Sequence, residues 1–521
     1  MAIPKIIGIE QEYAIHIKGD PSLTPFEASC MLVNAYARSL GLREPGMRML
    51  WDYAHETPYE DIRGRLYRKS PNQRVVCDED NLRINAGLPN GARFYTDHAH
   101  PEYSTAECLS ARHALACDKA GEIVLRKAVA EFKSLCPEIG ILLYKNNSDY
   151  KGHSYGCHEN YLMDAQAHEH HVAQASRLAD KVLIPFLVTR QVFAGAGKVG
   201  SEATHSRNAC YQLSQRADFI ENLYGLETMY ARPIINTRAE HHADARRFRR
   251  LHLILGDANM CEVAGFLKLG TTQIVLQMME AGFIDDDWTL KEPLNALRRI
   301  SLDYDTPFEL ASGRRLTAVQ VQRLFLEKAE AFKHSADAAA IAHYEQILAC
   351  WAEVLEGLDQ LELSRDFEIE DDPGDLVPKL DWVLKLWLFN RYKRSRDCSW
   401  DHPLLPVLDL QYHRVDNLDG LFYKLQADNM TTSVLEEKEI GYFVDHAPDD
   451  TRAWFRSRCI QKYAREVFLL NWEVVGFDHG DVHRMVPLLN PLKGTREQCE
   501  TLFSEAKDST ELISRLEEAS G

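Results

Sequence analysis

The chain has 521 residues, of which 45% are hydrophobic and 26% charged, which indicates a globular protein with two to three domains or one large domain and an appendage. Its formal net charge of −18 makes nucleic acid and anionic membrane surfaces poor partners. We expect a cytoplasmic protein with free thiols, because the sequence shows no membrane span, no targeting segment and no CxxC pair among its 12 cysteines.

The N-terminal region mixes strands and helices without the regular alternation of a parallel sheet. We expect a first strand over residues 5–15 and a helix over residues 25–39. Residues 48–70 are predicted to form a long loop, and loops of this length in compact domains are usually functional or disordered. A turn at Asn90-Gly91 then precedes a strand over residues 92–97.

A second helix is predicted from a capping box. Ser104 and Glu107 have the S-x-x-E spacing, so the helix is expected to start at Ser104 and to run towards Leu135. The elements expected next along the chain are a strand over 141–144, a strand over 154–163, a helix over 170–192, a strand over 251–255 and a helix over 261–279.

The C-terminal half is predicted to be mostly helical. Thr317 and Gln320 form another capping box, and apolar residues at helical spacing follow it. The pattern changes near residue 425, where strand-like segments around Val474 precede a final helix over residues 509–519. We therefore predict a large domain over residues 1–425 and a small C-terminal domain over residues 426–521.

Two glutamates interrupt the apolar first strand. Glu10 and Glu12 are two residues apart, so their side chains lie on the same face of the strand. Adjacent carboxylates repel each other unless a cation lies between them, and Mg²⁺ takes such oxygen ligands together with nucleotide phosphates. The alternative interpretation is a solvated strand face.

The segment from Phe94 to Glu102 concentrates further polar groups where a strand ends. Asp97 is a candidate base or nucleophile, and Glu102 is a candidate metal ligand that is expected to lie just before a helix N-terminus. Asp97 could instead only shape the turn. In the later strand, His158 and Asn160 share one face, and Cys157 and Glu159 share the other. A lone histidine in a strand is more often a hydrogen-bonded core residue than a ligand.

Several arginines lie in locally apolar sequence. Arg216 and Arg238 need anionic partners, which can be phosphate or a structural carboxylate. The run from Arg246 to Arg250 is predicted to be partly exposed, and His252 shares a face with Arg250. The sequence has no P-loop and no dinucleotide-binding fingerprint, so any nucleotide must be held by carboxylates, arginines and Mg²⁺.

These segments together resemble the family of depupylases and Pup ligases (the Dop/PafA family), which is part of the glutamine-synthetase-like carboxylate–amine ligases. The similarity keeps its order over most of the chain. The matching segments are residues 8–13, 51–53 with Pro58, Asp61, Arg63 and Gly64, 90–95, 97–104, 144–147, 158–162, 212–216, 236–238, 249–252 and 256–259.

The resemblance implies an α+β fold with a curved, mainly antiparallel sheet backed by helices and a small C-terminal domain. It further implies a site for ATP, or for ADP plus phosphate, together with Mg²⁺. The implied metal ligands are Glu10, Glu12, Tyr95, Glu102 and His158. The implied nucleotide-binding residues are Tyr95, His158, Asn160, Arg216 and Arg238, and the implied catalytic residues are Asp97, Arg216, Arg238 and His252.

The resemblance favours the depupylase branch of the family, because the ligases lack the insertion that corresponds here to an active-site loop at about residues 45–80. The implied activity is hydrolysis of the isopeptide bond between the C-terminal glutamate of Pup and substrate lysines, and also deamidation of a C-terminal glutamine of Pup. The implied partners are Pup, or a Pup-like modifier, and pupylated proteins.

Three alternatives stay open at this point. The first is a ligase that joins a γ-carboxylate to an amine, and the second is a silent binder of the modifier. The third is a diverged homologue that acts on another modifier or transfers or hydrolyses ATP phosphate, which departures such as Gln11, Thr96, His153 and Cys157 permit. An acidic, disordered modifier would bind a groove with basic walls, for which the run from Arg246 to Arg250 is a candidate.

Overall fold

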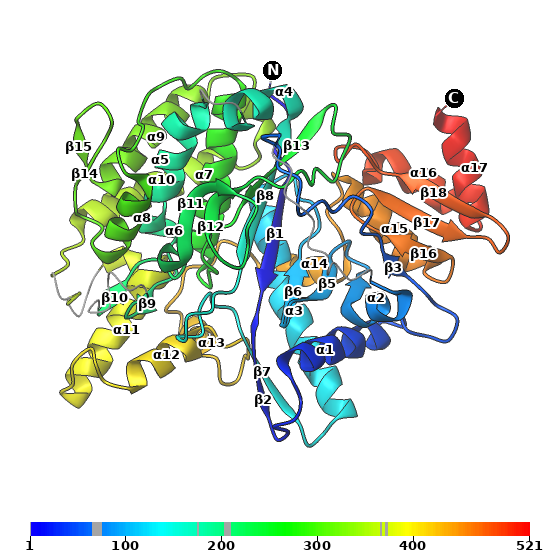
Figure 1. Cartoon of the computed structure of the whole chain (residues 1–521), viewed down its shortest axis with the longest axis horizontal. Helices are drawn as coiled ribbons and strands as arrows, with labels where there is room; N and C mark the ends of the chain where they lie inside the picture. Colours follow the sequence, from blue (N-terminus) through cyan, green and yellow to red (C-terminus); the bar gives the residue numbers. More distant parts are fainter. Residues whose placement is uncertain are drawn as a thin grey trace.

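An eight-stranded sheet crosses the centre of the protein (Figure 1), with strand order β11-β12-β13-β8-β1-β6-β5-β4. Its strands are β1 (Ile7–Glu12), β4 (Asn85–Gly87), β5 (Arg93–Asp97), β6 (His100–Ser104), β8 (Cys157–Asp164), β11 (Ile220–Gly225), β12 (Arg232–Asn236) and β13 (Phe248–Leu253). Neighbouring strands pair antiparallel except β11 and β12, which are parallel. The predicted α+β class with a mainly antiparallel sheet is confirmed.

The structure is a computed structural model, and it describes residues 2–64, 76–173, 177–202, 210–364, 367–369 and 374–520. Within these ranges, no helix is both long enough and apolar enough to cross a membrane.

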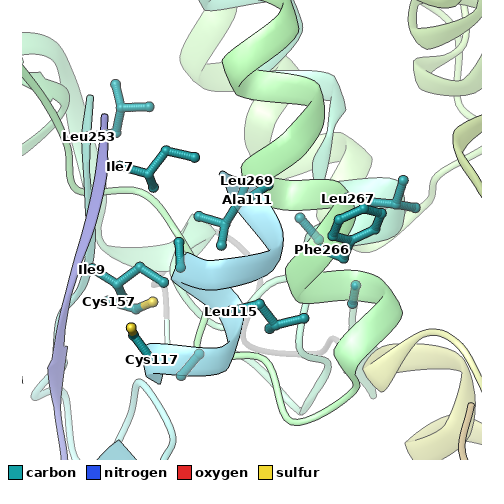
Figure 2. Packing of buried hydrophobic residues seen from close by; sticks show 14 of the residues in the cluster. Ile7, Ile9, Ala111, Leu115, Cys117, Cys157, Leu253, Phe266, Leu267 and Leu269 are labelled. Atoms are coloured by element: carbon teal, nitrogen blue, oxygen red, sulfur yellow. The ribbon is translucent and has the colours of Figure 1, made fainter. Parts of the chain in front are cut away.

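Two long helices, α3 (Ala111–Leu135) and α7 (Glu262–Glu280), back one face of the sheet. Ile7 and Ile9 of β1 point towards them, and Figure 2 shows both side chains packed on the side of Ala111 and Leu115. Because side chains alternate along a strand, Glu10 and Glu12 must then lie on the opposite face, which is free of these helices. One face of β1 thus builds the core and the other is left for a site.

Further helices pack around this core. Helix α1 (Pro25–Ser39) matches its predicted bounds and is capped by Thr24 and Glu27. The other helices are α2 (Asp78–Ile84), α4 (Ala165–His168), α5 (Ile184–Thr189), α6 (Gln191–Ala194), α8 (Pro293–Leu302), α9 (Ala318–Phe332), α10 (Tyr344–Gln360), α11 (Asp381–Arg396), α12 (Leu404–Tyr412), α13 (Leu421–Ala427), α14 (Glu437–Asp445), α15 (Arg452–Tyr463), α16 (Arg496–Glu505) and α17 (Ser509–Ser520). The capping box of Thr317 and Gln320 starts α9 as predicted.

A smaller four-stranded sheet lies at the C-terminal end of the molecule beside α16 and α17 (Figure 1). Its order is β18 (His483–Pro487), β17 (Val474–Asp478), β16 (Val467–Leu470) and β3 (Leu50–Trp51). The edge strand β3 comes from the N-terminal region and pairs parallel with β16. The predicted domain boundary near residue 425 stays a prediction. Short two-stranded pairs complete the strands, with β2 (Ala14–Lys18) on β7 (Gly140–Tyr144), β9 (Lys198–Val199) on β10 (Tyr211–Gln212), and β14 (Phe308–Glu309) on β15 (Arg315–Leu316).

Three predicted elements differ from the structure. The strand over 5–15 is two strands, because the chain leaves the large sheet at Tyr13 and β2 pairs with β7 instead. Ser104 ends β6 and does not cap a helix, since α3 starts after the N-cap Ser110. In the described part of residues 170–192, π-helical turns and the short helices α5 and α6 replace one continuous helix.

The predicted loop over 48–70 is described up to residue 64, and it contains only β3; its remaining residues lie outside the described ranges.

Candidate active site

The open face of β1 brings the predicted carboxylates together. In the register of the sheet, Glu10 lies opposite His158 of β8, and Glu12 lies opposite Glu102 of β6. Glu102 in turn lies opposite Tyr95 of β5. Strand pairing alone therefore places residues from four separate segments within reach of one another.

A first cluster surrounds Glu10. One oxygen of Glu10 lies 3.3 Å from His158 Nδ1 and 3.6 Å from His252 Nε2. The other oxygen accepts a hydrogen bond of 3.0 Å from Asn160 Nδ2 and lies 3.4 Å from an Arg250 Nη1. Ligand atoms of Glu10, His158 and His252 all lie within 4.8 Å of one another, which is close enough for one metal ion.

The pKa values of both Glu10 and His252 are lowered in this cluster. Burial acts to raise the pKa of Glu10, but the hydrogen bond from His158 and the Arg250 charge act against it, and the pKa is held well below its usual value. For His252, burial and the Arg250 charge push the pKa well below that of a free imidazole. The Glu10 carboxylate and the neutral His252 imidazole can both donate electron pairs, and this suits the binding of a cation.

A second cluster lies on the same face of the sheet, on the side of β1 where β6 and β5 lie. Ligand oxygens of Glu12, Asp97 and Glu102 all lie within 4.8 Å of one another. Glu12 also lies 3.1 Å from His100 Nδ1. Asp97 ends β5 as predicted; its side chain is 40% exposed, and His98 Nδ1 lies 2.7 Å from its Oδ2. An exposed carboxylate beside buried ones can meet a substrate from solvent.

Glu102 is the most buried carboxylate of this cluster. Burial and the nearby charges of Asp97, Glu12 and Glu10 raise its pKa well above the usual value. Glu12 differs, because the hydrogen bond and charge of His100 outweigh the effect of burial and lower its pKa. The predicted position of Glu102 before a helix N-terminus is wrong, since it lies in the middle of β6.

Arg216 is buried but pairs with no carboxylate among the described residues. It follows β10 and is not itself in a strand. Its Nη1 donates to Ser154 Oγ at 2.6 Å and to the Tyr155 carbonyl at 3.0 Å, while Nη2 donates to the Ile254 carbonyl at 2.6 Å. Its Nε has no hydrogen-bond partner in the described part of the chain. Burial and the Arg232 charge lower its pKa to about 10.

Arg238 lies where the loop after β3 meets the large sheet. Its Nε donates to the Leu226 carbonyl at 3.0 Å, and its main chain forms a bridge with Asp61. The backbone of Glu60 and Ile62 hydrogen-bonds to Ala239 and Thr237 on either side of it. Neither Arg216 nor Arg238 contacts the two carboxylate clusters by a hydrogen bond that the structure describes. The loop, however, reaches a predicted site residue.

A cavity of about 90 Å³, which we call the Glu10 cavity, opens beside the first cluster. Its lining joins the large sheet to the C-terminal region and includes Glu10, Ser104, Asn160, Arg250, Arg452 and Trp472. It combines a tryptophan ring, two guanidinium groups and the carboxylates of Glu10 and Glu107, and this lining can contact a ligand that has both a ring and polar groups.

Sequence reasoning missed some of these contributors. The run from Arg246 to Arg250 is predicted to be partly exposed, and its members differ: the Arg246 side chain is 87% exposed, whereas that of Arg250 is only 11% exposed and pairs with Glu240 at 2.8 Å. The sequence does contain a signal for Arg250. Side chains alternate along β13, so Arg250 lies on the same face as the candidate site residue His252. His100 gave no signal that separates it from a surface residue.

Comparisons with known proteins agree over nearly the whole chain. The family model described as Pup-ligase protein matches residues 5–476. A depupylase from Acidothermus cellulolyticus is 42% identical, covering 98% of this chain and 99% of the relative. The Pup deamidase/depupylase of Mycolicibacterium smegmatis is 38% identical over the same shares of both chains. A Pup–protein ligase from Paenarthrobacter aurescens is 37% identical over 83% of this chain and 95% of the relative.

Solved structures show the same fold. The ligase PafA in complex with the prokaryotic ubiquitin-like protein Pup aligns with a TM-score of 0.75 and 28% identity, covering 99% of this chain and 94% of that chain. PafA in complex with ADP aligns with a TM-score of 0.70 and 29% identity, covering 84% of this chain and 97% of that chain.

Proposed function

The chain belongs to the Pup-ligase protein family, and from this membership we propose that it is a nucleotide-dependent depupylase. Its reaction is hydrolysis of the isopeptide bond between the C-terminal glutamate of Pup and a substrate lysine, with deamidation of a C-terminal glutamine as a related activity. The observation that carries this proposal is the full-length match to the depupylase relatives, whereas the ligase relative covers less of the chain.

The proposed partners follow from the same relatives. Pup, or a Pup-like modifier, and pupylated proteins are proposed because the names of the relatives specify Pup and a Pup-bound structure of PafA shares the fold. The net charge of −18 supports the absence of nucleic acid as a partner. Location in the cytoplasm stays a prediction.

The chemistry of the site fits a nucleotide with Mg²⁺. The cluster of Glu12, Asp97 and Glu102 offers only oxygen ligands, which Mg²⁺ prefers. Both ring nitrogens of His252 are buried without a hydrogen-bond partner among the described residues, so a donor set remains unused beside Glu10. The ADP-bound PafA structure supports a nucleotide in the same fold.

Gly156 supports the same fit. A Cβ atom at this position would lie 2.5 Å from His158 Nε2 and 2.6 Å from Glu12 Oε1. Any side chain here would therefore displace two proposed metal ligands. The space is kept open by the one residue that has no side chain.

We assign the residues as follows. Glu10, Glu12, Tyr95, Glu102 and His158 are the proposed metal ligands; Tyr95, His158, Asn160, Arg216 and Arg238 are proposed to hold the nucleotide. When bound, Mg²⁺ would supply the positive charge that can polarise the reacting carbonyl. Part of the nucleotide is proposed to lie in the Glu10 cavity, because this cavity adjoins the first cluster; its volume of about 90 Å³ is too small for base and ribose together.

Asp97 is the proposed base or nucleophile. It is the exposed member of the carboxylate cluster, and His98 fixes its orientation through the 2.7 Å contact. Water is added across the amide bond, so that the modifier leaves with a carboxylate and the lysine leaves as a free amine. Arg216, Arg238 and His252 are proposed to lie around the scissile bond, where Arg216 stabilises the negative charge that develops on the carbonyl oxygen.

The first test is the substitution Asp97→Asn. With a pupylated protein, ADP, phosphate and Mg²⁺, the parent protein should release Pup, and Asp97→Asn should slow release by about 10²- to 10⁴-fold, because an amide cannot accept the proton or attack. Release is followed by gel electrophoresis. Asp20→Asn, at an exposed turn outside the site, is the matched control and should keep the parental rate. Equal rates for Asp97→Asn and the parent would contradict the assignment.

A further inference from the structure

Arg93 occupies an unusual position on the site face of β5. It shares this face with Tyr95 and Asp97, and it is only 7% exposed. Its guanidinium carbon lies 3.9 Å from the ring centroid of Tyr95 and 4.2 Å from that of Trp51. The cation is therefore held between two aromatic rings, one from β5 of the large sheet and one from β3 of the C-terminal sheet.

Hydrogen bonds fix Arg93 in this position. Its Nε and Nη2 donate to Asn85 Oδ1 at 3.1 and 2.6 Å, and Nη2 also lies 3.2 Å from the Tyr53 hydroxyl oxygen. Asn85 Nδ2 donates to the same hydroxyl at 2.8 Å. The planar fork of an arginine makes all these contacts at once, which a lysine cannot do.

Charge around Arg93 points in the same direction. Glu56 Oε1 lies 3.7 Å from Arg93 Nη1 and accepts a hydrogen bond of 3.3 Å from the Trp51 indole. Glu102 is also close enough to stabilise the cation electrostatically. Arg93 thus lies between a carboxylate of the loop and the carboxylate cluster.

Trp51 continues the contact towards the Glu10 cavity. Its ring meets Trp472 edge to face, with centroids 5.2 Å apart and an interplanar angle of 76°. Trp472 lines the cavity beside Glu10. A continuous set of contacts therefore runs from the cavity wall through Trp51 and Arg93 to Tyr95, which is a proposed metal ligand.

We propose that Arg93 is a positioning residue that couples the Glu10 cavity to the carboxylate cluster, by fixing Trp51 on one side and Tyr95 on the other. This inference rests on the proposed function, because it takes the cavity and the cluster as the nucleotide and metal sites. Arg93 itself contacts the proposed ligand Tyr95 and not the reacting atoms. Its loss should therefore weaken the binding of nucleotide and metal together.

The test is binding of ADP with Mg²⁺, measured by calorimetry on the full chain without any Pup substrate. Arg93→Gln should weaken Mg·ADP binding by about 5- to 30-fold, since it removes a desolvated cation from between two rings. Arg93→Lys keeps the cation but loses the fork, so it should recover part of the affinity. Circular dichroism should show the same helix content in both variants. If Arg93 acted only in folding, the affinity would not fall in Arg93→Gln and recover in part in Arg93→Lys at unchanged helix content.

Arg43→Gln is the matched control. Arg43 also lies beside Asn85, where it donates to the Leu82 carbonyl at 2.9 Å and to the Asn85 carbonyl, but it has no ring contact in the described structure. It should lower the melting temperature and leave Mg·ADP affinity within about twofold. If Arg93→Gln does not fold, Trp51→Leu, which removes only the outer ring, should weaken Mg·ADP binding by about threefold or more.

The outcomes separate the two proposals. A folded Arg93→Gln protein with parental Mg·ADP affinity overturns the coupling role and leaves the proposed function intact; parental affinity in Trp51→Leu does the same. If the parent protein itself binds no Mg·ADP, the proposed nucleotide site fails, and the coupling role fails with it.

Discussion

Glu102 differs from Glu10 and Glu12 in the direction in which its pKa is shifted. Burial and three neighbouring carboxylates raise its pKa well above the usual value, whereas partner histidines keep Glu10 and Glu12 below theirs. One compact site thus combines two carboxylates whose pKa is lowered with one that resists ionisation. A cation that binds all three must displace the proton of Glu102.

We therefore predict that Mg·ADP binding strengthens as pH rises through a range above the ordinary pKa of glutamate. The sign follows from the raised pKa, because the protonated form persists at low pH and only the carboxylate binds the cation. Calorimetry in two buffers with different ionisation enthalpies should show that binding releases protons.

Glu102→Gln should bind Mg·ADP more weakly and should lose the pH dependence. Glu500→Gln, on the exposed surface of α16, should retain both. Binding by the parent protein that is the same across this pH range would contradict the raised pKa of Glu102.

Single residues of the site were predictable from the sequence to different degrees. Glu10, Glu12, Asp97 and Glu102 are polar groups in apolar strands, and this is a signal that a sequence contains. The contacts of Arg93 and Arg250 depend instead on which strands become neighbours. The sequence therefore predicts the candidate carboxylates but not the cations that surround them.

At the scale of elements, Glu107 links distant parts of the chain by ion pairs, although its spacing from Ser104 predicts a helix cap. It follows β6, and its carboxylate lies 2.8 Å from Arg452 Nε and also pairs with Arg456, both of α15. Burial acts to raise the pKa of Glu107, but the two arginines outweigh it and lower the pKa to about 2. The ion pairs are buried, so water screens them little.

This shift predicts a pH-dependent stability. The pKa of Glu107 is lowered in the folded state, so its contribution is complete above the ordinary value for glutamate and is lost as pH falls towards about 2. The difference corresponds to about 3 kcal/mol of unfolding free energy. Glu107→Gln should lose about that amount at neutral pH, because it leaves two buried arginines without their carboxylate.

Urea unfolding at neutral and at acidic pH checks this prediction. The gap in stability between parent and Glu107→Gln should narrow as pH falls. Glu439→Gln, which removes a less buried partner of Arg112, is the control and should cost less. A gap that is constant with pH would show that Glu107 acts through packing and not through charge.

Element boundaries show where local sequence is insufficient. Helix α1 was predictable to the residue, since its cap and apolar pattern are local. The break between β1 and β2 was not, because both strands have the same alternation and only the partner strand β7 distinguishes them. The false helix start at Ser104 has the correct spacing, but pairing of β6 with β1 and β5 prevails over it.

At the scale of the whole molecule, the segment from Leu50 to Gly64 connects regions that are far apart in the sequence. One end adds β3 to the C-terminal sheet, and the other pairs with the backbone around Arg238. A strand of two residues has no recognisable pattern in a sequence, so this connection was not predictable. The overall fold was predictable only because the family resemblance covers most of the chain.

We propose that the site hydrolyses a Pup conjugate without consuming a nucleotide in each turnover. The most direct measurement is the number of Pup molecules released from a pupylated protein for each nucleotide consumed, with Mg²⁺ present. We predict that many Pup molecules are released for each nucleotide hydrolysed and that no new conjugate forms. Conjugates that stay intact, or new conjugates formed with one ADP each, would contradict the claim and favour a ligase.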